Sequence, residues 1–248
     1  MMKAIGRPRL ILKRPVVWVT GASRGIGREI ACQFASTGCI VAISARSQSQ
    51  LRTVENEINS LGGQAKTFVC DVTDHRSVAS TAAKIIHDFG TIDILVNNAG
   101  ITSFESFQKT SIQHFDRVMA ASFRGPVLVI KHVYPFMMKR KSGWIVNILS
   151  TAALETFSNS SAYSAAKSGL RALGNALREE SRLHNIRVTN VYPGPTNTEM
   201  WSEKDRRKYG SRMMSANSVA AAILALYQMP SDVVVEEIIL RPIQGDIE

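Results

Sequence analysis

The sequence predicts an α/β protein whose single domain is a doubly wound parallel sheet of about seven strands with helices on both faces. Three observations point to this fold class. Short apolar runs of strand length alternate with longer segments of helical length, the connections between them are short, and the first apolar run leads through a glycine-rich turn into a helix. Strict alternation of this kind favours right-handed crossovers, which make the strands parallel.

The predicted elements follow one another without a linker or an internal repeat. The first run, 16–19, is continuously apolar, as in strands buried on both faces of a parallel sheet. Gly38, Gly62 and Gly90 each end a helical segment. We expect strands at 16–19, 39–44, 67–70, 94–97, 144–148, 187–191 and 238–240, with helices from the glycine turn to 37 and at 48–61, 75–89, 111–139 and 162–183.

Length and composition fit one large α/β domain, here residues 15–248. The chain has 248 residues, 45% hydrophobic and 20% charged, and its longest early apolar run, 10–12, is too short for a signal peptide core. No apolar run approaches a membrane span. Cys32, Cys39 and Cys70 show no C-x-x-C spacing, which favours buried thiols in a reducing, cytoplasmic compartment. The five histidines lack metal-ligand spacing, so no metal site is expected.

The net charge of +10 is concentrated at the N-terminus. Residues 1–14 carry five basic side chains and no acid, and we interpret them as a basic extension: a disordered segment, an over-assigned start or a short arm. A mitochondrial presequence is an alternative that Pro8 and the short length disfavour. Nucleic-acid binding would need interleaved aromatic residues, which are missing. The basic balance instead favours an anionic ligand, such as a phosphate-bearing cofactor or an acidic carrier.

The stretch 193–215 interrupts the alternation. It is rich in Met, Arg and Lys, contains Trp201, and is long for a loop in a compact domain. We expect a substrate lid around 195–215, with a plain surface excursion as the alternative.

Tyr163 and Lys167 lie one helical turn apart, which places both side chains on one helix face. A free phenol, with a pKa of about 10, is a poor acid or base at neutral pH. A neighbouring ammonium favours the phenolate and lowers that pKa, so the pair is a candidate acid/base.

The glycine turn 20–27 predicts a dinucleotide site. Gly21, Gly25 and Gly27 let the backbone approach a pyrophosphate at the helix N-terminus. An NAD-selective site usually presents an acid after the second strand, but this chain has Arg46 there and Arg24 in the turn. Arginines pair with a 2′-phosphate, so the expected cofactor is NADP(H).

From about residue 15 to 245 the chain resembles the classical short-chain dehydrogenases/reductases, including their NADP-dependent 3-oxoacyl-carrier-protein reductase-like and carbonyl reductase-like members. The joint order of the turn 20–27, residues 71–72, 97–100, Ser150, the Tyr163/Lys167 pair and 192–198 carries the resemblance. It implies a Rossmann-like fold. The cofactor-binding residues it implies, together with the glycine turn, are Gly21, Ser23, Arg24, Gly25, Ile26, Gly27, Arg46, Asp71, Val72, Asn98, Ala99, Gly100, Tyr163, Lys167, Pro193, Gly194, Thr196 and Thr198.

The same resemblance implies catalytic roles. Ser150, 13 residues before Tyr163, would steady the charge on the substrate oxygen. Tyr163 would be the general acid/base, and Lys167 would lower its pKa and hold the nicotinamide ribose. The family commonly has an asparagine where this chain has Ser122. In the family that asparagine helps hold a water molecule that relays protons to the lysine. In this chain the Ser122 hydroxyl or the Ser122 backbone carbonyl would have to hold that water.

The resemblance thus implies an NADP(H)-dependent oxidoreductase that interconverts a ketone and a secondary alcohol. Two alternatives remain: a 3-oxoacyl-carrier-protein reductase, docking an acidic carrier through Lys139, Arg140 and Lys141, and a non-catalytic NADP(H)-binding regulatory protein. Members of the family usually form dimers or tetramers, so the resemblance also implies a homodimer or homotetramer. Homologous positions suggest a substrate pocket formed by Leu154, Phe157, Tyr192, Met200 and Trp201.

Overall fold

A seven-stranded parallel sheet forms the centre of the computed structural model, which describes residues 14–102 and 104–247. The strand order is β3-β2-β1-β4-β5-β6-β9, and every pairing in this sheet is parallel. The strands are β1 (Val16–Thr20), β2 (Ile40–Ala45), β3 (Gln64–Val69), β4 (Ile94–Asn97), β5 (Gly143–Ile148), β6 (Ile186–Pro193) and β9 (Glu237–Leu240). This confirms the predicted fold class.

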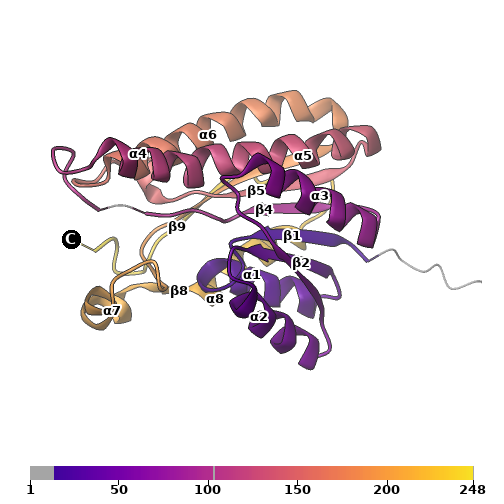
Figure 1. Cartoon of the computed structure of the whole chain (residues 1–248), viewed down its shortest axis with the longest axis horizontal. Helices are drawn as coiled ribbons and strands as arrows, with labels where there is room; N and C mark the ends of the chain where they lie inside the picture. The colour runs from indigo at the N-terminus through magenta and orange to yellow at the C-terminus, as the bar shows by residue number, and fades with distance from the viewer. Residues whose placement is uncertain (1–13, 103, 248) are drawn as a thin grey trace, which may run out of the picture.

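Helices cover both faces of the sheet. In Figure 1 the helices α1 (Gly25–Ser36), α2 (Gln48–Ser60) and α8 (Ala216–Tyr227) lie below it. The helices α3 (His75–Phe89), α4 (Ile112–Met119), α5 (Gly125–Arg140) and α6 (Ser161–Ser181) lie above it. Alternation along β1 explains the two layers, because Val17 and Val19 join one buried cluster while Val16 and Trp18 join the other.

The chain order of the strands reverses between β1 and β4. From β1 the chain proceeds outward to β2 and β3, and then returns to place β4 on the other side of β1. Doubly wound sheets bind ligands beyond the carboxyl ends of their strands at such a reversal. The glycine turn follows β1 and residues 98–100 follow β4, so both lie at this point.

The predicted helix 111–139 is wrong as a single helix. It consists of α4 and α5, joined by a π-helical segment, Ala120–Arg124, that contains Ser122. The N–H of Gly125 donates to the carbonyl of Ala120, five residues back. Pro126 has no N–H to donate to the carbonyl of Ser122, which favours this widened turn over a continuous α-helix.

The stretch 193–215 is more ordered than its composition suggested. It contains β7 (Thr196–Asn197) paired with β8 (Met214–Ser215), the helix α7 (Glu203–Tyr209) and a short 3₁₀ turn, Gly210–Arg212. The helix α8 that follows was not predicted, because its apolar residues lie nearly all around it rather than in one stripe.

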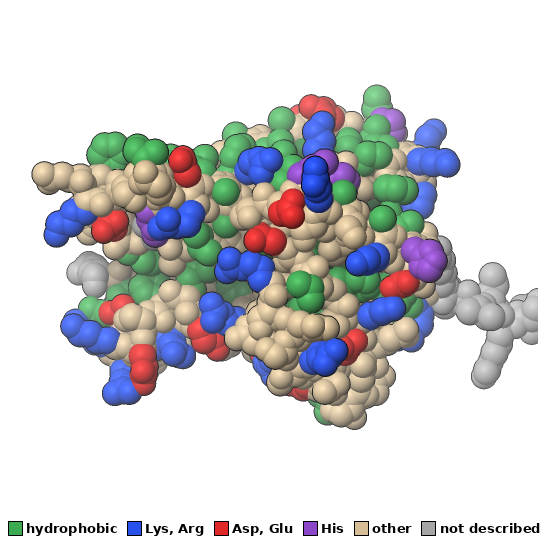
Figure 2. All heavy atoms as spheres, viewed as in Figure 1, with side chains coloured by type: hydrophobic (Ala, Val, Ile, Leu, Met, Phe, Trp, Pro, Cys, Tyr) green, Lys and Arg blue, Asp and Glu red, His purple; other side chains and the backbone are tan. Residues whose placement is uncertain are grey.

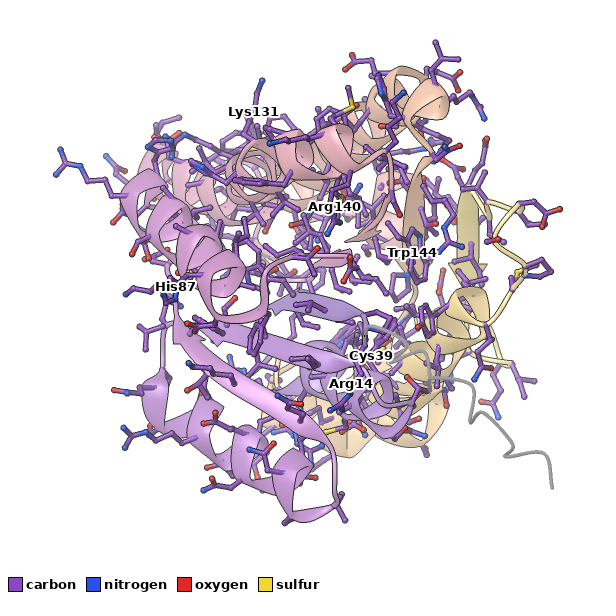
Figure 3. The ribbon with its side chains drawn as sticks, turned by 90° about the vertical axis from the view of Figure 1, so that its right-hand side faces the viewer. Arg14, Cys39, His87, Lys131, Arg140 and Trp144 are labelled. Atoms are coloured by element: carbon purple, nitrogen blue, oxygen red, sulfur yellow. The ribbon has the colours of Figure 1, made fainter. Side chains whose placement is uncertain are left out.

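The three residues 139–141 lie at the edge of the sheet opposite the carboxyl ends of the strands. Lys139 and Arg140 end α5 and precede the first residue of β5. Figure 3, which faces the right-hand side of Figure 1, shows Arg140 near Trp144 at this edge. Arg140 is used structurally, since it donates to Asp93 at 3.0 Å and to the carbonyl of Ile92 at 2.9 Å.

Residues 1–13, which carry most of the predicted basic extension, lie outside the described residues. Arg14, also assigned to that extension, is part of the fold: it donates to the side chain of Gln64 at 2.7 Å and to the carbonyl of Gly38. Among the described residues, no helix is long and apolar enough to cross a membrane. The described residues also include no group of three or more His, Cys, Asp or Glu side chains that could hold a metal ion.

Candidate active site

Of the four predicted catalytic residues, Ser150, Tyr163 and Lys167 line one cavity of about 230 Å³ at the carboxyl ends of β4, β5 and β6, whereas Ser122 lies outside the lining. Ser150 follows β5, while α6 brings Tyr163 and Lys167 to the same place. In Figure 2 apolar side chains lie recessed at the left of the molecule, between the α4 and α7 regions of Figure 1. The fold therefore brings Ser150 together with the Tyr163/Lys167 pair, as predicted from their order in the sequence.

Lys167 and Tyr163 are both buried, at 4% and 7% exposure. The ammonium Nζ of Lys167 lies 5.7 Å from the Tyr163 ring centroid and donates to the carbonyl of Ile148 at 2.7 Å. A Cβ atom placed on Gly100 would lie 3.7 Å from the same Nζ. The ammonium is thus held between the end of β5 and the loop after β4.

Burial shifts the pKa values of this pair in opposite directions. Removal from water disfavours the charged form, so it raises the pKa of Tyr163 to about 12 and lowers the pKa of Lys167 to about 8. A hydrogen bond with the Ser150 side chain lowers the Tyr163 pKa, but by less. The expectation that Lys167 depresses the phenol pKa is not met here: burial dominates the shift of the Tyr163 pKa, and the only lowering contribution comes from Ser150.

Ser150 is oriented by the backbone that follows it. Its Oγ accepts a hydrogen bond from the N–H of Ala152 at 3.1 Å, at the start of the 3₁₀ turn Thr151–Ala153. A serine Oγ accepts more than one hydrogen bond and donates one. The Ala152 bond therefore fixes the oxygen while leaving its proton for a group in the cavity.

Ser122 holds the loop after β4. Its hydroxyl donates to the carbonyl of Ile101 at 2.8 Å and accepts from the N–H of Ile101 at 3.0 Å. The side chain is fully buried, and its Oγ lies 3.1 Å from where a Cβ on Gly100 would be. The Ser122 hydroxyl proton is already donated to Ile101. Of the two groups predicted to hold the relay water, the Ser122 backbone carbonyl is therefore a better candidate than the hydroxyl.

The glycine turn is fastened to the loop after β4. Gly21 and Gly25 have positive φ angles of 65° and 56°, which side chains rarely adopt. The Asn98 amide donates to the carbonyls of Thr20 and Gly21, each at 3.0 Å. The Thr20 hydroxyl accepts from the N–H groups of Asn98 and Ala99, each at 3.1 Å. Asn98 therefore shapes the turn, with its side-chain nitrogen committed to the turn's own backbone.

The two cations predicted to face a 2′-phosphate are Arg24, within the turn, and Arg46, after β2. Arg24 is the residue before α1, and both arginines are exposed.

The other predicted cofactor residues near the turn are Asp71, Val72, Ser23 and Ile26. Beyond β3, Asp71 is held by Thr73, whose N–H and hydroxyl donate to the same carboxylate oxygen at 2.9 and 2.8 Å. Val72 packs against Gly125, where an added Cβ would lie 2.9 Å from its side chain. Ser23 is half-buried in the turn, and Ile26 lines the cavity.

The loop after β6 closes the cavity from a third side. Pro193, Gly194, Thr196 and Thr198 all line it. The Thr196 hydroxyl donates to the Gly194 carbonyl at 2.9 Å. A Cβ on Gly25 would lie 3.2 Å from the Thr198 methyl, so the glycine turn and this loop are in close contact.

Of the five residues predicted to form a substrate pocket, the structure brings three to the cavity and places two elsewhere. Phe157, Met200 and Trp201 line the cavity. Tyr192 is instead fully buried in a core cluster, with its hydroxyl donating to Glu237 at 2.6 Å, and Leu154 packs against that cluster. Tyr192 belongs to β6, so alternation along the strand directs it into the core.

Nine lining residues were not among the predicted site residues: Thr102, Phe104, Ile148, Leu149, Thr151, Ala152, Pro195, Asp246 and Ile247. Phe104 comes from the loop after β4, which carried a motif only as far as Gly100. Asp246 and Ile247 come from the C-terminal tail, which no motif covered.

Comparison with known proteins decides the family. The model for short chain dehydrogenases matches residues 15–208. The chain belongs to this family. It is therefore an oxidoreductase of the class that acts on CH–OH and C=O groups.

Named relatives cover nearly the whole chain. A protein named sepiapterin reductase from Chlorobaculum tepidum is 34% identical over 240 residues, covering 94% of this chain and 98% of its own. A metagenomic short-chain oxidoreductase in complex with NADP is 32% identical, with a TM-score of 0.82, covering 92% of this chain and 96% of its own. Actinorhodin polyketide ketoreductase with NADPH is 28% identical, with a TM-score of 0.86 and the same coverage.

Proposed function

We propose that this protein is an NADP(H)-dependent reductase that interconverts a ketone and a secondary alcohol. The single observation that carries the proposal is the meeting of Ser150, Tyr163 and Lys167 in one cavity beside the glycine turn and the loop after β6. A proton donor, an oxyanion donor and a dinucleotide cradle are the parts that carbonyl reduction needs.

The cofactor residues fit a phosphate-bearing dinucleotide. The free N–H groups at the start of α1 and the positive-φ glycines suit a pyrophosphate. Arg24 and Arg46 suit a 2′-phosphate, and solved relatives described as NADP or NADPH complexes support this choice. When bound, the nicotinamide supplies or takes the hydride.

The protonation states suit reduction at neutral pH. Tyr163, with a pKa of about 12, holds its proton and can donate it to a carbonyl oxygen. Ser150 Oγ–H donates to the same oxygen and stabilises its developing charge. Lys167, with a pKa of about 8, is protonated near neutral pH. Its proton can replace the one that Tyr163 gives to the substrate. Lys167 would in turn regain a proton from the side of Ser122, which lies with Lys167 beside Gly100.

The stretch 195–215 acts in this proposal as a lid on a single domain, 15–248. Met200 and Trp201 already line the cavity, and α7 lies directly behind them in the chain. Homo-oligomerisation and a cytoplasmic location stay predictions from the sequence.

A carrier-dependent reductase stays a second candidate, since a polyketide ketoreductase is among the solved relatives. Its predicted docking residues, however, lie at the wrong edge of the sheet. The non-catalytic alternative rests on Ser122 alone, and the Ser122 hydroxyl has a structural use that is compatible with catalysis.

Replacement of the phenol tests the proposal. We expect the purified full-length protein to oxidise NADPH in the presence of aryl ketones, and Tyr163→Phe to lower kcat by at least about a hundredfold, the usual contribution of general acid catalysis. NADPH binding, measured by calorimetry, should change little. Turnover that survives in Tyr163→Phe, or NADPH binding without turnover in the wild type, would contradict the proposal.

A further inference from the structure

The C-terminal tail returns from β9 to the active-site cavity. Asp246 and Ile247 line this cavity together with Ser150 and Tyr163. In Figure 1 the last described residues of the chain lie between the regions of α4 and α7. The tail is therefore a wall of the site that no sequence motif indicated.

Arg241 holds the tail in place. Its guanidinium pairs with the Oδ2 atom of Asp246 and, at 2.9 Å, with Glu155 in the segment after the Ser150 turn. The arginine thus bridges the tail and the segment that carries the catalytic serine. One Asp246 oxygen is used in this bridge.

The other oxygen, Asp246 Oδ1, is buried and has no hydrogen-bond partner within residues 14–102 and 104–247. It lies 3.0 Å from where a Cβ on Gly194 would be, so it faces the loop after β6. Leaving a buried acceptor unsatisfied costs about 1–3 kcal/mol. A carboxylate oxygen can only accept, so its missing partner is an N–H or O–H donor.

The neighbouring wall of the cavity is aromatic. Phe104 stacks on Trp201 with ring centroids 5.6 Å apart and an interplanar angle of 26°, and it lies 6.5 Å from the Tyr163 ring. Phe157 and Met200 extend this apolar lining. Such pockets bind flat rings by contact area and orient them through a few polar groups.

We propose that Asp246 is a specificity-determining residue that accepts a hydrogen bond from an N–H group of the substrate. The substrate class is a flat aromatic or heteroaromatic ketone with an amide-like N–H, its ring against Phe104 and Trp201 and its carbonyl toward Tyr163. This inference rests on the proposed ketone reduction and names the substrate of that same site.

A matched pair of ketones tests it by binding. The probes are acetyloxindole, a flat aryl methyl ketone with a lactam N–H, and its N-methyl derivative, titrated calorimetrically into full-length Tyr163→Phe with saturating NADPH. We expect the N–H ketone to bind about tenfold or more tighter, the range for a hydrogen bond to a charged group. In Tyr163→Phe combined with Asp246→Ala or Asp246→Asn, the preference should disappear or shrink.

Glu155→Gln is the matched control. It weakens the Arg241 bridge from its other end but leaves Asp246 Oδ1 in place, so the preference should persist. Three results would overturn the proposal: no preference in Tyr163→Phe, equal weakening of both ketones by Asp246→Ala, or weakened NADPH binding in that variant. The last would assign the oxygen to the cofactor. Wild-type turnover of both ketones is measured separately, so failure of the reductase proposal is distinguishable from failure of this one.

Discussion

At the scale of single residues, the buried Lys167 gives the site a titration near pH 8. Its ammonium is protonated below about pH 8 and neutral above it, whereas Tyr163 keeps its proton to about pH 12. We therefore expect kcat/KM for ketone reduction to be flat from pH 6 to 7 and to fall as pH rises through about 8, where the proton supply behind Tyr163 is lost. A pH–rate profile at fixed ionic strength checks this. A fall that begins only near pH 10 would contradict it.

The lowered pKa of Lys167 also makes the free energy of unfolding depend on pH, even without a bound substrate. Between about pH 8 and 10 the unfolded state keeps the Lys167 proton and the folded state does not, so the free energy of unfolding rises with pH. The rise attributable to Lys167 is roughly 2 kcal/mol. Lys167→Met removes the titrating group, so urea unfolding should show a smaller rise in this variant than in the wild type. Equal slopes would mean that Lys167 has an ordinary pKa.

Residue-scale prediction from the sequence succeeded where a motif fixes a local geometry. Tyr163 and Lys167 share a helix face by spacing alone, and Ser150 follows from its interval. It failed for Leu154 and Tyr192, whose direction is set by packing against other elements. Asp246 was not predictable, because its place in the cavity results from the Arg241 bridge between distant segments.

At the scale of elements, a buried asparagine ladder ties α6 to the sheet. Asn97, Asn147 and Asn190 are register partners on β4, β5 and β6, and their amides are linked by two hydrogen bonds of 3.1 Å. Gly174 of α6 packs on the ladder, since an added Cβ would lie 2.4 Å from Asn190 Oδ1. The helix that carries Tyr163 and Lys167 is thereby seated directly on the strands that lead to the rest of the site.

This packing predicts different outcomes for alanine substitutions at two glycines of α6. In a helix, Gly→Ala ordinarily stabilises by about 1 kcal/mol. Gly174→Ala should instead destabilise by about 2 kcal/mol, because the methyl group collides with the ladder, and it should lower kcat by displacing Tyr163. Gly169→Ala is the control: the atoms nearest to its Cβ would be those of the Phe123 ring, at 3.3 Å, so stability should change by less than about 1 kcal/mol. Urea unfolding of both variants measures the difference.

The strands of the main sheet could be predicted from the sequence, whereas one helix boundary and one helix could not. Apolar runs identified all seven strands of the main sheet. The signal is strongest for the five inner strands, which are buried on both faces, whereas the edge strands β3 and β9 are partly exposed. The break between α4 and α5 was missed although Pro126 marks it, since a proline in a first turn and one inside a helix look alike without knowledge of the boundary. The helix α8 lacks a polar face wide enough to reveal its period.

At the scale of the whole molecule, the length of the strands separates the active-site cavity from the cations Lys139 and Lys141. The glycine turn, Ser150 and Gly194 all follow strand ends, so the chemistry lies at the carboxyl edge. Lys139 and Lys141 precede β5, whose six residues span roughly 20 Å, so these cations lie at the far edge. Lys204 of α7 is the exposed lysine nearest in the chain to the lining residues Met200 and Trp201.

This arrangement predicts how a carrier-bound substrate would respond to charge reversal. Lys139→Glu combined with Lys141→Glu should leave kcat/KM within about twofold of wild type for acetoacetyl groups on an acidic carrier and on a small thiol, because surface changes far from the site have little effect. Lys204→Glu is the matched change in α7, close in the chain to the lining residues Met200 and Trp201. If a carrier docks there, this change should lower kcat/KM for the carrier-bound group alone, by weakening electrostatic steering. A selective loss in the Lys139/Lys141 variant would instead place the docking surface at the far edge, against the geometry of the sheet.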